Sequence, residues 1–160
     1  MARIYIVGAV GSGKSTFAKK ISKELDIPYY ELDSICWKSN GTGKRNSSEI
    51  EKLFSDMLKN ENWVIENVGS DFDQGFEKAD TIIYLDISKS VVHRRIVFRW
   101  IKCRLGISKK PFKSTFKMLK NEIEWADKEL NTKRKLNKLQ LYKEKLVILN
   151  EKQTKKYKYK

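Results

Sequence analysis

The segment from Gly8 to Ser15 constrains the fold of this chain more than any other feature of the sequence. Its residues, G-A-V-G-S-G-K-S, match the phosphate-binding pattern G-x-x-x-x-G-K-[ST]. A short apolar run from Ile4 to Val7 precedes the segment, and apolar residues at helical spacing follow it. A strand, this loop and a helix in succession are the context in which the pattern binds a nucleoside triphosphate. We therefore expect nucleotide binding here, rather than a plain glycine-rich turn.

Each residue type in this loop suits a phosphate group for a different physical reason. The glycines allow successive backbone N–H groups to turn toward an anion. The helix that follows directs the positive end of its dipole at the same place. Lys14 brings a positive charge to the β- and γ-phosphates, and the hydroxyl of Ser15 is a ligand for Mg²⁺.

Chain length and cysteine usage limit the class of protein. With 160 residues, the chain is long enough for one domain with a sizeable core. Its start lacks the charged and apolar regions of a signal peptide, and no run of about 18 apolar residues occurs, so we expect neither a leader nor a membrane span. Cys36 and Cys103 form no C-x-x-C pair, which favours free thiols in the cytoplasm over a zinc site.

Positive charge is concentrated in the last part of the chain. Residues 1–99 hold 15 Lys and Arg against 14 Asp and Glu, whereas residues 100–160 hold 19 against 6. The second part therefore carries 13 of the formal net charge of +14. Such asymmetry favours a polyanionic partner, either nucleotide phosphates or a weakly bound nucleic acid. The alternative is a lysine-rich solvated surface.

Two acidic residues lie at the ends of expected strands. Residues 29–32 are predicted to form a second strand that ends at Asp33, and residues 63–68 a third strand that contains Glu66. Open α/β sheets bind ligands at the carboxyl ends of their strands. Asp33 could there accept a proton from an acceptor hydroxyl or hold a Mg²⁺-bound water, although an aspartate is also common as a helix cap. Glu66 is the second acidic candidate for the Mg²⁺ shell.

A helix expected over residues 89–104 carries three basic residues on one face, namely Arg95, Arg99 and Lys102. Like charges at this spacing repel each other by about 0.2–0.5 kcal/mol per pair, so an anion between them would explain the grouping. A solvated basic face is the alternative. His93, the only histidine, has no partner visible in the sequence and is expected at the surface.

The expected elements alternate between strands and helices. One helix starts with a capping-box pattern from Ser48 to Glu51, and crossovers of this kind produce a parallel sheet with helices on both faces. We predict an α/β fold of the P-loop NTPase type, with three α/β/α layers, a five-stranded parallel sheet and a helical lid insertion at about 100–135. Residues 1–150 form its single domain, and residues 151–160 are predicted to be a basic disordered tail.

The N-terminal loop, the Arg95–Arg99 pair and the helical insertion before the last strand resemble the adenylate-kinase-like group of P-loop kinases. Three further segments, Y-Y-E-L-D-S-I-C-W, W-V-I-E-N-V-G and T-F-K-M-L-K, resemble bacterial proteins named DNA topology modulation proteins over residues 1 to about 150. These resemblances imply a P-loop kinase fold that uses ATP and Mg²⁺.

The resemblance also implies roles for single residues. Those that contact ATP would be Gly8, Gly11, Ser12, Gly13, Lys14, Ser15 and Thr16. Arg95 would stack on the nucleotide base, and Arg99 would reach the transferred phosphoryl group. The catalytic candidates are then Lys14, Asp33 and Arg99, and the metal candidates are Ser15 and Glu66.

The sequence leaves the reaction open among three alternatives. Adenylate kinases have Asp-Gly-Phe-Pro-Arg after the third strand, whereas residues 66–70 read E-N-V-G-S and provide no arginine to clamp an acceptor phosphate. The favoured function is a Mg²⁺- and ATP-dependent phosphotransferase that acts on a nucleotide, nucleoside or metabolite. The alternatives are an ATP-binding regulator that contacts nucleic acid through the basic region, and a nucleotide-binding protein without turnover.

Overall fold

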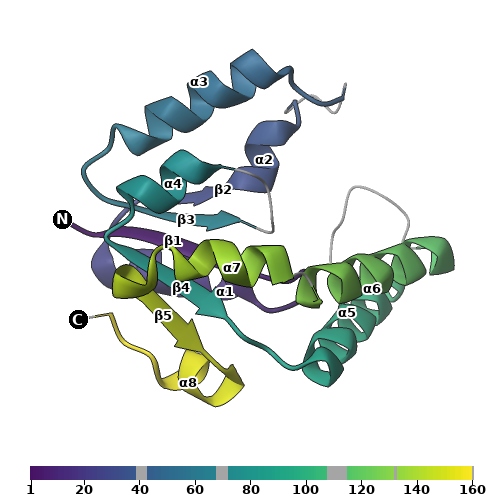
Figure 1. Ribbon diagram of the computed structural model, residues 1–160. Helices are drawn as coiled ribbons and strands as arrows, with labels where there is room; N and C mark the ends of the chain where they lie inside the picture. Colours follow the sequence, from purple (N-terminus) through teal and green to yellow (C-terminus); the bar gives the residue numbers. More distant parts are fainter. Residues whose placement is uncertain (39–42, 68–71, 108–114, 132, 160) are drawn as a thin grey trace.

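A computed structural model of the chain describes residues 1–38, 43–67, 72–107, 115–131 and 133–159. One sheet is formed by β1 (Arg3–Gly8), β2 (Tyr29–Glu31), β3 (Trp63–Asn67), β4 (Thr81–Leu85) and β5 (Leu146–Leu149). Its strand order is β2-β3-β1-β4-β5, and every pairing is parallel (Figure 1). The predicted five-stranded parallel sheet is therefore confirmed.

Helices connect the strands and complete the chain. They are α1 (Lys14–Leu25), α2 (Leu32–Cys36), α3 (Ser47–Leu58), α4 (Asp73–Lys78), α5 (Lys89–Arg104), α6 (Phe116–Leu130), α7 (Lys133–Gln140) and α8 (Glu151–Lys156), with a short 3-10 helix at Lys143–Lys145. In the described ranges, none of these helices is both long enough and apolar enough to cross a membrane.

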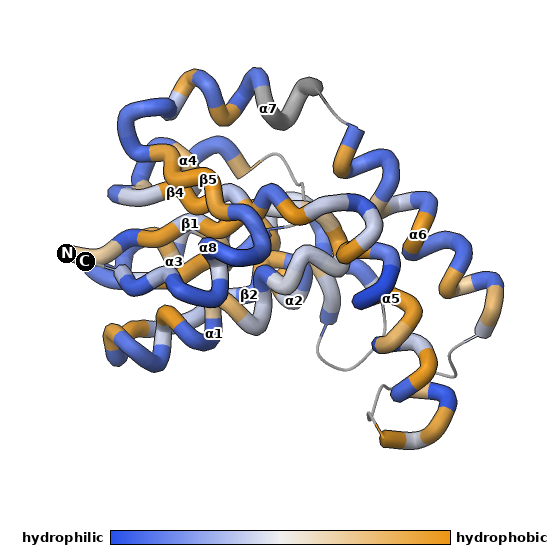
Figure 2. The backbone as a smooth tube through the Cα atoms, turned by 90° about the horizontal axis from the view of Figure 1, so that it is seen from below, coloured by the Kyte–Doolittle hydropathy of each residue, from blue (hydrophilic) through white to orange (hydrophobic). Residues whose placement is uncertain are grey.

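Helices cover both faces of the sheet because its strands are apolar on both sides. In β1, Ile4 and Ile6 belong to one core cluster, whereas Tyr5 and Val7 belong to the other. The first cluster includes residues of α1, α5 and α6, and the second includes residues of α2, α3, α4 and α7. Figure 2 shows β1, β4 and β5 as largely hydrophobic segments between these helices. Full burial of one such side chain stabilises the fold by about 1.5–3 kcal/mol, so the three-layer arrangement follows from the strand sequences.

Helices α5 and α6 pack side by side in the region expected as the lid (Figure 1). Asp127 of α6 joins them, because its carboxylate oxygens lie 2.7 Å from His93 Nε2 and 2.9 Å from Lys89 Nζ. The hydrogen bond from Lys89 holds the pKa of Asp127 below its ordinary value. His93, which was expected at the surface, is half-buried, and the sequence showed no partner for it because Asp127 comes from a helix that is distant in the sequence.

Residues 151–160 were expected to form a disordered tail, but the described part of this segment is ordered. Helix α8 begins after Asn150, whose side chain accepts a hydrogen bond from the backbone N–H of Gln153. Tyr157 then packs on the core, with its ring centroid 5.8 Å from that of Phe17. A capping box and a partly buried aromatic ring thus outweigh the polar composition of the segment.

The start of α3 also differs from the prediction. The capping box was expected at Ser48 and Glu51, whereas the structure forms it two residues earlier. The side chain of Asn46 accepts from the backbone N–H of Glu49, and Glu49 accepts from the backbone N–H of Asn46. Asn is as good an N-cap residue as Ser, so the local pattern alone allowed both registers.

Candidate functional site

The predicted site residues meet at one edge of the sheet, because the carboxyl ends of parallel strands lie together. The phosphate loop follows β1, Asp33 follows β2, Glu66 lies near the end of β3, and α5 follows β4. A cleft of about 440 Å³ lies there. It is lined by Val10, Gly11, Gly13, Lys14, Ser15, Thr16, Glu31, Asp33, Glu66, Arg95, Arg99, Glu122 and Trp125.

Two glycines allow the loop to pack directly against α5. Gly11 and Gly13 have φ angles of +76° and +93°, a backbone region that other residues rarely adopt. A Cβ atom on Gly11 would lie 2.8 Å from Cγ1 of Ile96, and one on Gly13 would lie 3.2 Å from Nη1 of Arg95. Gly13 is also the N-cap of α1, where no described side chain caps the helix. The first N–H groups of α1 are therefore suited to an anion in the cleft.

Lys14 is buried to an unusual degree for a lysine, with 5% of its surface exposed. Its Nζ donates a hydrogen bond to the carbonyl oxygen of Ala9, at 2.9 Å, and so bends back over the loop. Lysine is rarely buried, because removing an ammonium group from water is costly. The loop therefore holds this cation on the lining of the cleft, where its charge suits a phosphate group.

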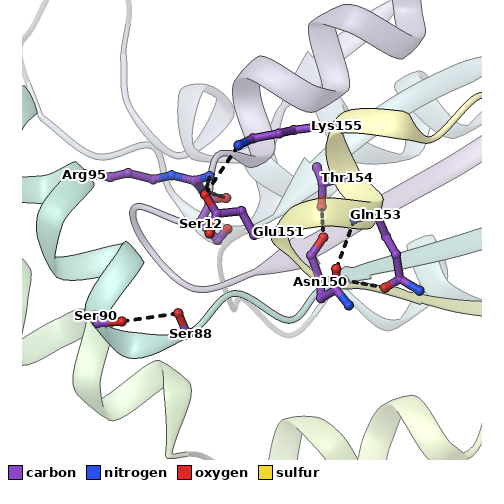
Figure 3. A network of polar contacts seen from close by, with 9 residues as sticks. All are labelled: Ser12, Ser88, Ser90, Arg95, Asn150, Glu151, Gln153, Thr154 and Lys155. Atoms are coloured by element: carbon purple, nitrogen blue, oxygen red, sulfur yellow. Dashed lines mark hydrogen bonds and ion pairs between the residues drawn. The ribbon is translucent and has the colours of Figure 1, made fainter.

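Both predicted arginines of α5 line the cleft, and each has a partner that the sequence did not reveal. Arg95 Nη1 donates to the carbonyl oxygen of Ser12 at 2.5 Å, and its Nη2 lies 3.7 Å from Glu151 Oε1 in α8 (Figure 3). Arg99 Nη2 donates to Glu122 Oε2 in α6 at 2.9 Å. Lys102, the third basic residue of this face, does not line the cleft.

Besides Glu122, the partner of Arg99, three carboxylates line the same cleft. Glu31 of β2 pairs in register with Glu66 of β3, and Asp33 follows in the first turn of α2. Burial is the main cause that raises the pKa of Asp33, and the negative charge of Glu66 adds to it, while Lys14 opposes it. Burial likewise raises the pKa of Glu31, with added repulsion from Glu66 and Asp33. Sequence reasoning missed Glu31, although its place two residues before Asp33 at a strand end was a usable signal.

Tyr29 connects the two predicted metal ligands. Its hydroxyl donates to Glu66 Oε1 at 2.8 Å. Burial and this hydrogen bond raise the pKa of Tyr29, while a contact with the Ser15 hydroxyl acts in the opposite direction. Sequence reasoning assigned Tyr29 only to a strand, and its role depends on the pairing of β2 with β3.

The oxygen atoms of Ser15 and Glu66 fit a magnesium ion. Glu66 is 3% exposed, and its Oε2 has no hydrogen-bond partner among the described residues. Within the same part of the chain, no group of three or more His, Cys, Asp or Glu side chains is arranged to hold a metal. Mg²⁺ is usually held by one or two protein ligands together with substrate phosphates and water, so a hydroxyl and one carboxylate are a suitable set.

The parallel sheet with its glycine-rich loop after β1 matches the fold of solved kinase structures. No family model matches the chain. Among solved structures, the shikimate kinase of Bacteroides thetaiotaomicron has a TM-score of 0.56 at 19% identity and covers 97% of this chain and 92% of its own. A gluconokinase of Sinorhizobium meliloti 1021 has a TM-score of 0.53 at 18% identity and covers 93% of this chain and 82% of its own. These likenesses confirm the predicted fold.

Searches by sequence find an uncharacterized protein and shikimate kinases among the relatives of this chain. The uncharacterized protein YqaC of Bacillus subtilis (strain 168) is 28% identical over 125 residues, which are 77% of this chain and 70% of that protein. The shikimate kinase of Sulfurihydrogenibium sp. (strain YO3AOP1) is 23% identical over 150 residues, or 84% of this chain and 90% of that protein. None of these names refers to DNA topology, so that part of the resemblance remains a prediction.

Proposed function

We propose that this protein is a small-molecule kinase, which transfers the γ-phosphoryl group of ATP to a hydroxyl group. The observation that supports it is one cleft that holds both cations and carboxylates. Lys14, Ser15 and the two arginines, Arg95 and Arg99, suit a nucleoside triphosphate, and the Asp33 carboxylate lines the same cleft. The names of the relatives, shikimate kinase and gluconokinase, support a small acceptor molecule without identifying it.

The proposed reaction needs mainly positioning and charge stabilisation. The acceptor oxygen forms a bond to the γ-phosphorus, the bond from that phosphorus to the β–γ bridging oxygen breaks, and the hydroxyl proton passes to Asp33. Lys14 and Arg99 stabilise the negative charge on the moving group, and Arg95 lies beside the loop where the nucleotide base would stack. Ser15 and Glu66 would hold Mg²⁺, which when bound neutralises charge on the β- and γ-phosphates.

The test is ADP formation from ATP and Mg²⁺ in the presence of single nucleosides, nucleotides, sugars and other hydroxyl compounds. A kinase produces ADP at a rate that depends on the acceptor, together with a phosphorylated product that mass spectrometry detects. ATP binding without any ADP formation would instead favour a nucleotide-binding protein without turnover. If ADP forms at the same rate with each candidate acceptor as with none, the protein is an ATPase.

We place this reaction in the cytoplasm. Cys36 and Cys103 are both free thiols in the structure. Free cysteines are typical of proteins in a reducing compartment, which supports this location.

Nucleic-acid binding through the basic region is the alternative, and the comparisons give it no support. Part of the basic excess is engaged within the protein: Lys138 forms an ion pair with Asp73, and Lys145 Nζ donates to the carbonyl oxygens of Glu77 and Ala79. Lysines held in this way are not available to a phosphate backbone.

We therefore expect duplex DNA to bind weakly, with a Kd of about 10⁻⁴–10⁻⁶ M at physiological salt, and independently of ATP. A salt titration by fluorescence anisotropy, with and without MgATP, measures both properties. A surface that makes six or more phosphate contacts would lose about 10³-fold in affinity between about 50 and 200 mM salt. Such a loss, combined with a tenfold effect of ATP, would favour the regulator over the kinase.

A further inference from the structure

Tyr29 is held in place by contacts with β3 and α1. It is the first residue of β2 and pairs in register with Val64 of β3, and its ring packs against the first of the two core clusters. Lys19 of α1 lies over the same ring, with its Nζ 5.5 Å from the ring centroid. Contacts of both the backbone and the ring therefore restrict the direction of this side chain.

From this position the Tyr29 hydroxyl reaches both residues that suit magnesium. It donates to Glu66 Oε1 at 2.8 Å, and it also contacts the Ser15 hydroxyl. Glu66 lies two residues beyond the register partner of Tyr29, and therefore on the same face of the sheet, because side chains alternate along a strand. The hydroxyl of Tyr29 is thus an outer partner of the candidate metal site.

The hydrogen bond from Tyr29 makes the two oxygens of Glu66 unequal. Oε1 is occupied by the tyrosine hydroxyl, whereas Oε2 is buried and has no hydrogen-bond partner among the described residues. Glu66 lines the cleft and is only 3% exposed, so its carboxylate is closely packed and has little room to rotate. A cation in the cleft would therefore meet one oxygen of this carboxylate instead of two.

The number of oxygens that a carboxylate offers distinguishes two common divalent cations. Mg²⁺ requires nearly ideal octahedral geometry and keeps several waters, so one oxygen from a carboxylate suits it. Ca²⁺ is larger, takes about six to eight oxygen ligands in a flexible arrangement, and often binds both oxygens of one carboxylate. A carboxylate that is restricted to one oxygen thus favours Mg²⁺.

We propose that Tyr29 is a positioning residue that makes the metal site selective for Mg²⁺ over Ca²⁺. This inference rests on the proposed function and specifies how its metal ion is selected. By occupying Oε1, the Tyr29 hydroxyl keeps Glu66 a ligand with one available oxygen, and by its contact with Ser15 it orients the other protein ligand. Loss of the hydroxyl would give Ca²⁺ a further oxygen and would leave Mg²⁺ with less well oriented ligands.

The test measures binding of AMP-PNP, a non-hydrolysable ATP analogue, by isothermal titration calorimetry with Mg²⁺, with Ca²⁺ and with EDTA. We expect the wild-type protein to bind the Mg²⁺ complex at least about tenfold more tightly than the Ca²⁺ complex. In Tyr29→Phe we expect this ratio to fall below about threefold, because loss of an outer partner typically costs about 10–100-fold in metal affinity. The affinity in EDTA does not depend on the metal and should change less than about twofold.

Tyr30→Phe is the matched control, because it makes the same chemical change at the next residue of β2. The Tyr30 hydroxyl accepts a hydrogen bond from Asn60, and Tyr30 does not line the cleft, so this variant should keep the wild-type ratio. Glu66→Gln is a second test variant, which removes the charged ligand that Tyr29 orients and should abolish the preference for Mg²⁺. Thermal unfolding followed by circular dichroism shows whether each variant is folded.

Three results would each overturn the inference: equal binding of the two metal complexes by the wild-type protein, an unchanged ratio in Tyr29→Phe, or an equal fall of the ratio in Tyr30→Phe. If Tyr29→Phe does not fold, Glu66→Gln decides, and a retained preference for Mg²⁺ in that variant overturns the inference. Absence of AMP-PNP binding under all three conditions contradicts the proposed function and the inference together. Binding of AMP-PNP without a preference between the metals contradicts the inference alone.

Discussion

Replacement of Lys14 by alanine is expected to abolish measurable ATP binding and turnover while the fold is retained. Lys14 Nζ is held at 2.9 Å from the Ala9 carbonyl oxygen, inside the loop and on the lining of the cleft. Removal of one preorganised hydrogen-bond donor from a developing charge typically lowers turnover by about 10²–10³-fold. Because Lys14→Ala removes a full positive charge from a triphosphate site, we expect its loss of turnover to be at least about 10³-fold. Calorimetry with ATP and Mg²⁺, together with an ADP assay, measures the effect.

The fold should survive this change because the burial of Lys14 contributes little to the free energy of unfolding. Its aliphatic stem contributes some packing, but an ammonium group with 5% exposure carries a desolvation cost that the alanine variant avoids. Thermal unfolding followed by circular dichroism checks this point. Lys23→Ala is the matched control, since Lys23 is an exposed residue of the same helix, far from the loop. ATP binding of wild-type strength in Lys14→Ala would refute phosphate binding by this loop.

Replacement of Arg99 by alanine is expected to lower turnover by about 10³-fold, with a smaller effect on ATP affinity, because a transition-state arginine acts mainly on the transferring group. Arg99 lies on the cleft, four residues after Arg95 on the same face of α5. Arg95→Ala should instead weaken nucleotide binding first, since Arg95 contacts the loop itself through the Ser12 carbonyl oxygen. Steady-state kcat and KM for ATP separate the two effects.

The ion pair between Arg99 and Glu122 requires its own control. Because Arg99 Nη2 lies 2.9 Å from Glu122 Oε2, the alanine variant also removes a contact between α5 and α6. Glu122→Gln weakens that contact and keeps the arginine, and we expect it to lower turnover by less than about tenfold. Lys102→Ala tests a basic residue of the same helix that does not line the cleft. Slight and equal effects of Arg95→Ala and Arg99→Ala would show that the pair is only a solvated helix face.

The sequence by itself determined the class of fold and the phosphate-loop part of the candidate site. The loop pattern, the apolar strands and the helical spacing are local signals, because each depends on residues within a few positions of one another. Right-handed crossovers then leave few ways to connect alternating strands and helices, so the parallel sheet followed. The face of α5 that carries Arg95 and Arg99 was predictable for the same reason, since helical geometry places residues four apart on one side.

Only the tertiary structure decided which carboxylates gather in the cleft and which residues are the partners of the arginines. Glu31 and Glu66 become neighbours through the pairing of β2 with β3, and the hydrogen bond from Tyr29 to Glu66 spans 37 positions. The order of the last residues likewise depends on packing of Tyr157 against Phe17, which the polar composition of that segment concealed. Contacts between residues distant in the sequence have no periodic pattern, because they arise when separate elements pack together. The phosphate loop could therefore be recognised from eight consecutive residues. The cleft, by contrast, is lined by residues of that loop together with residues of α2 and α6, which belong to different core clusters, so it forms only when these elements pack together.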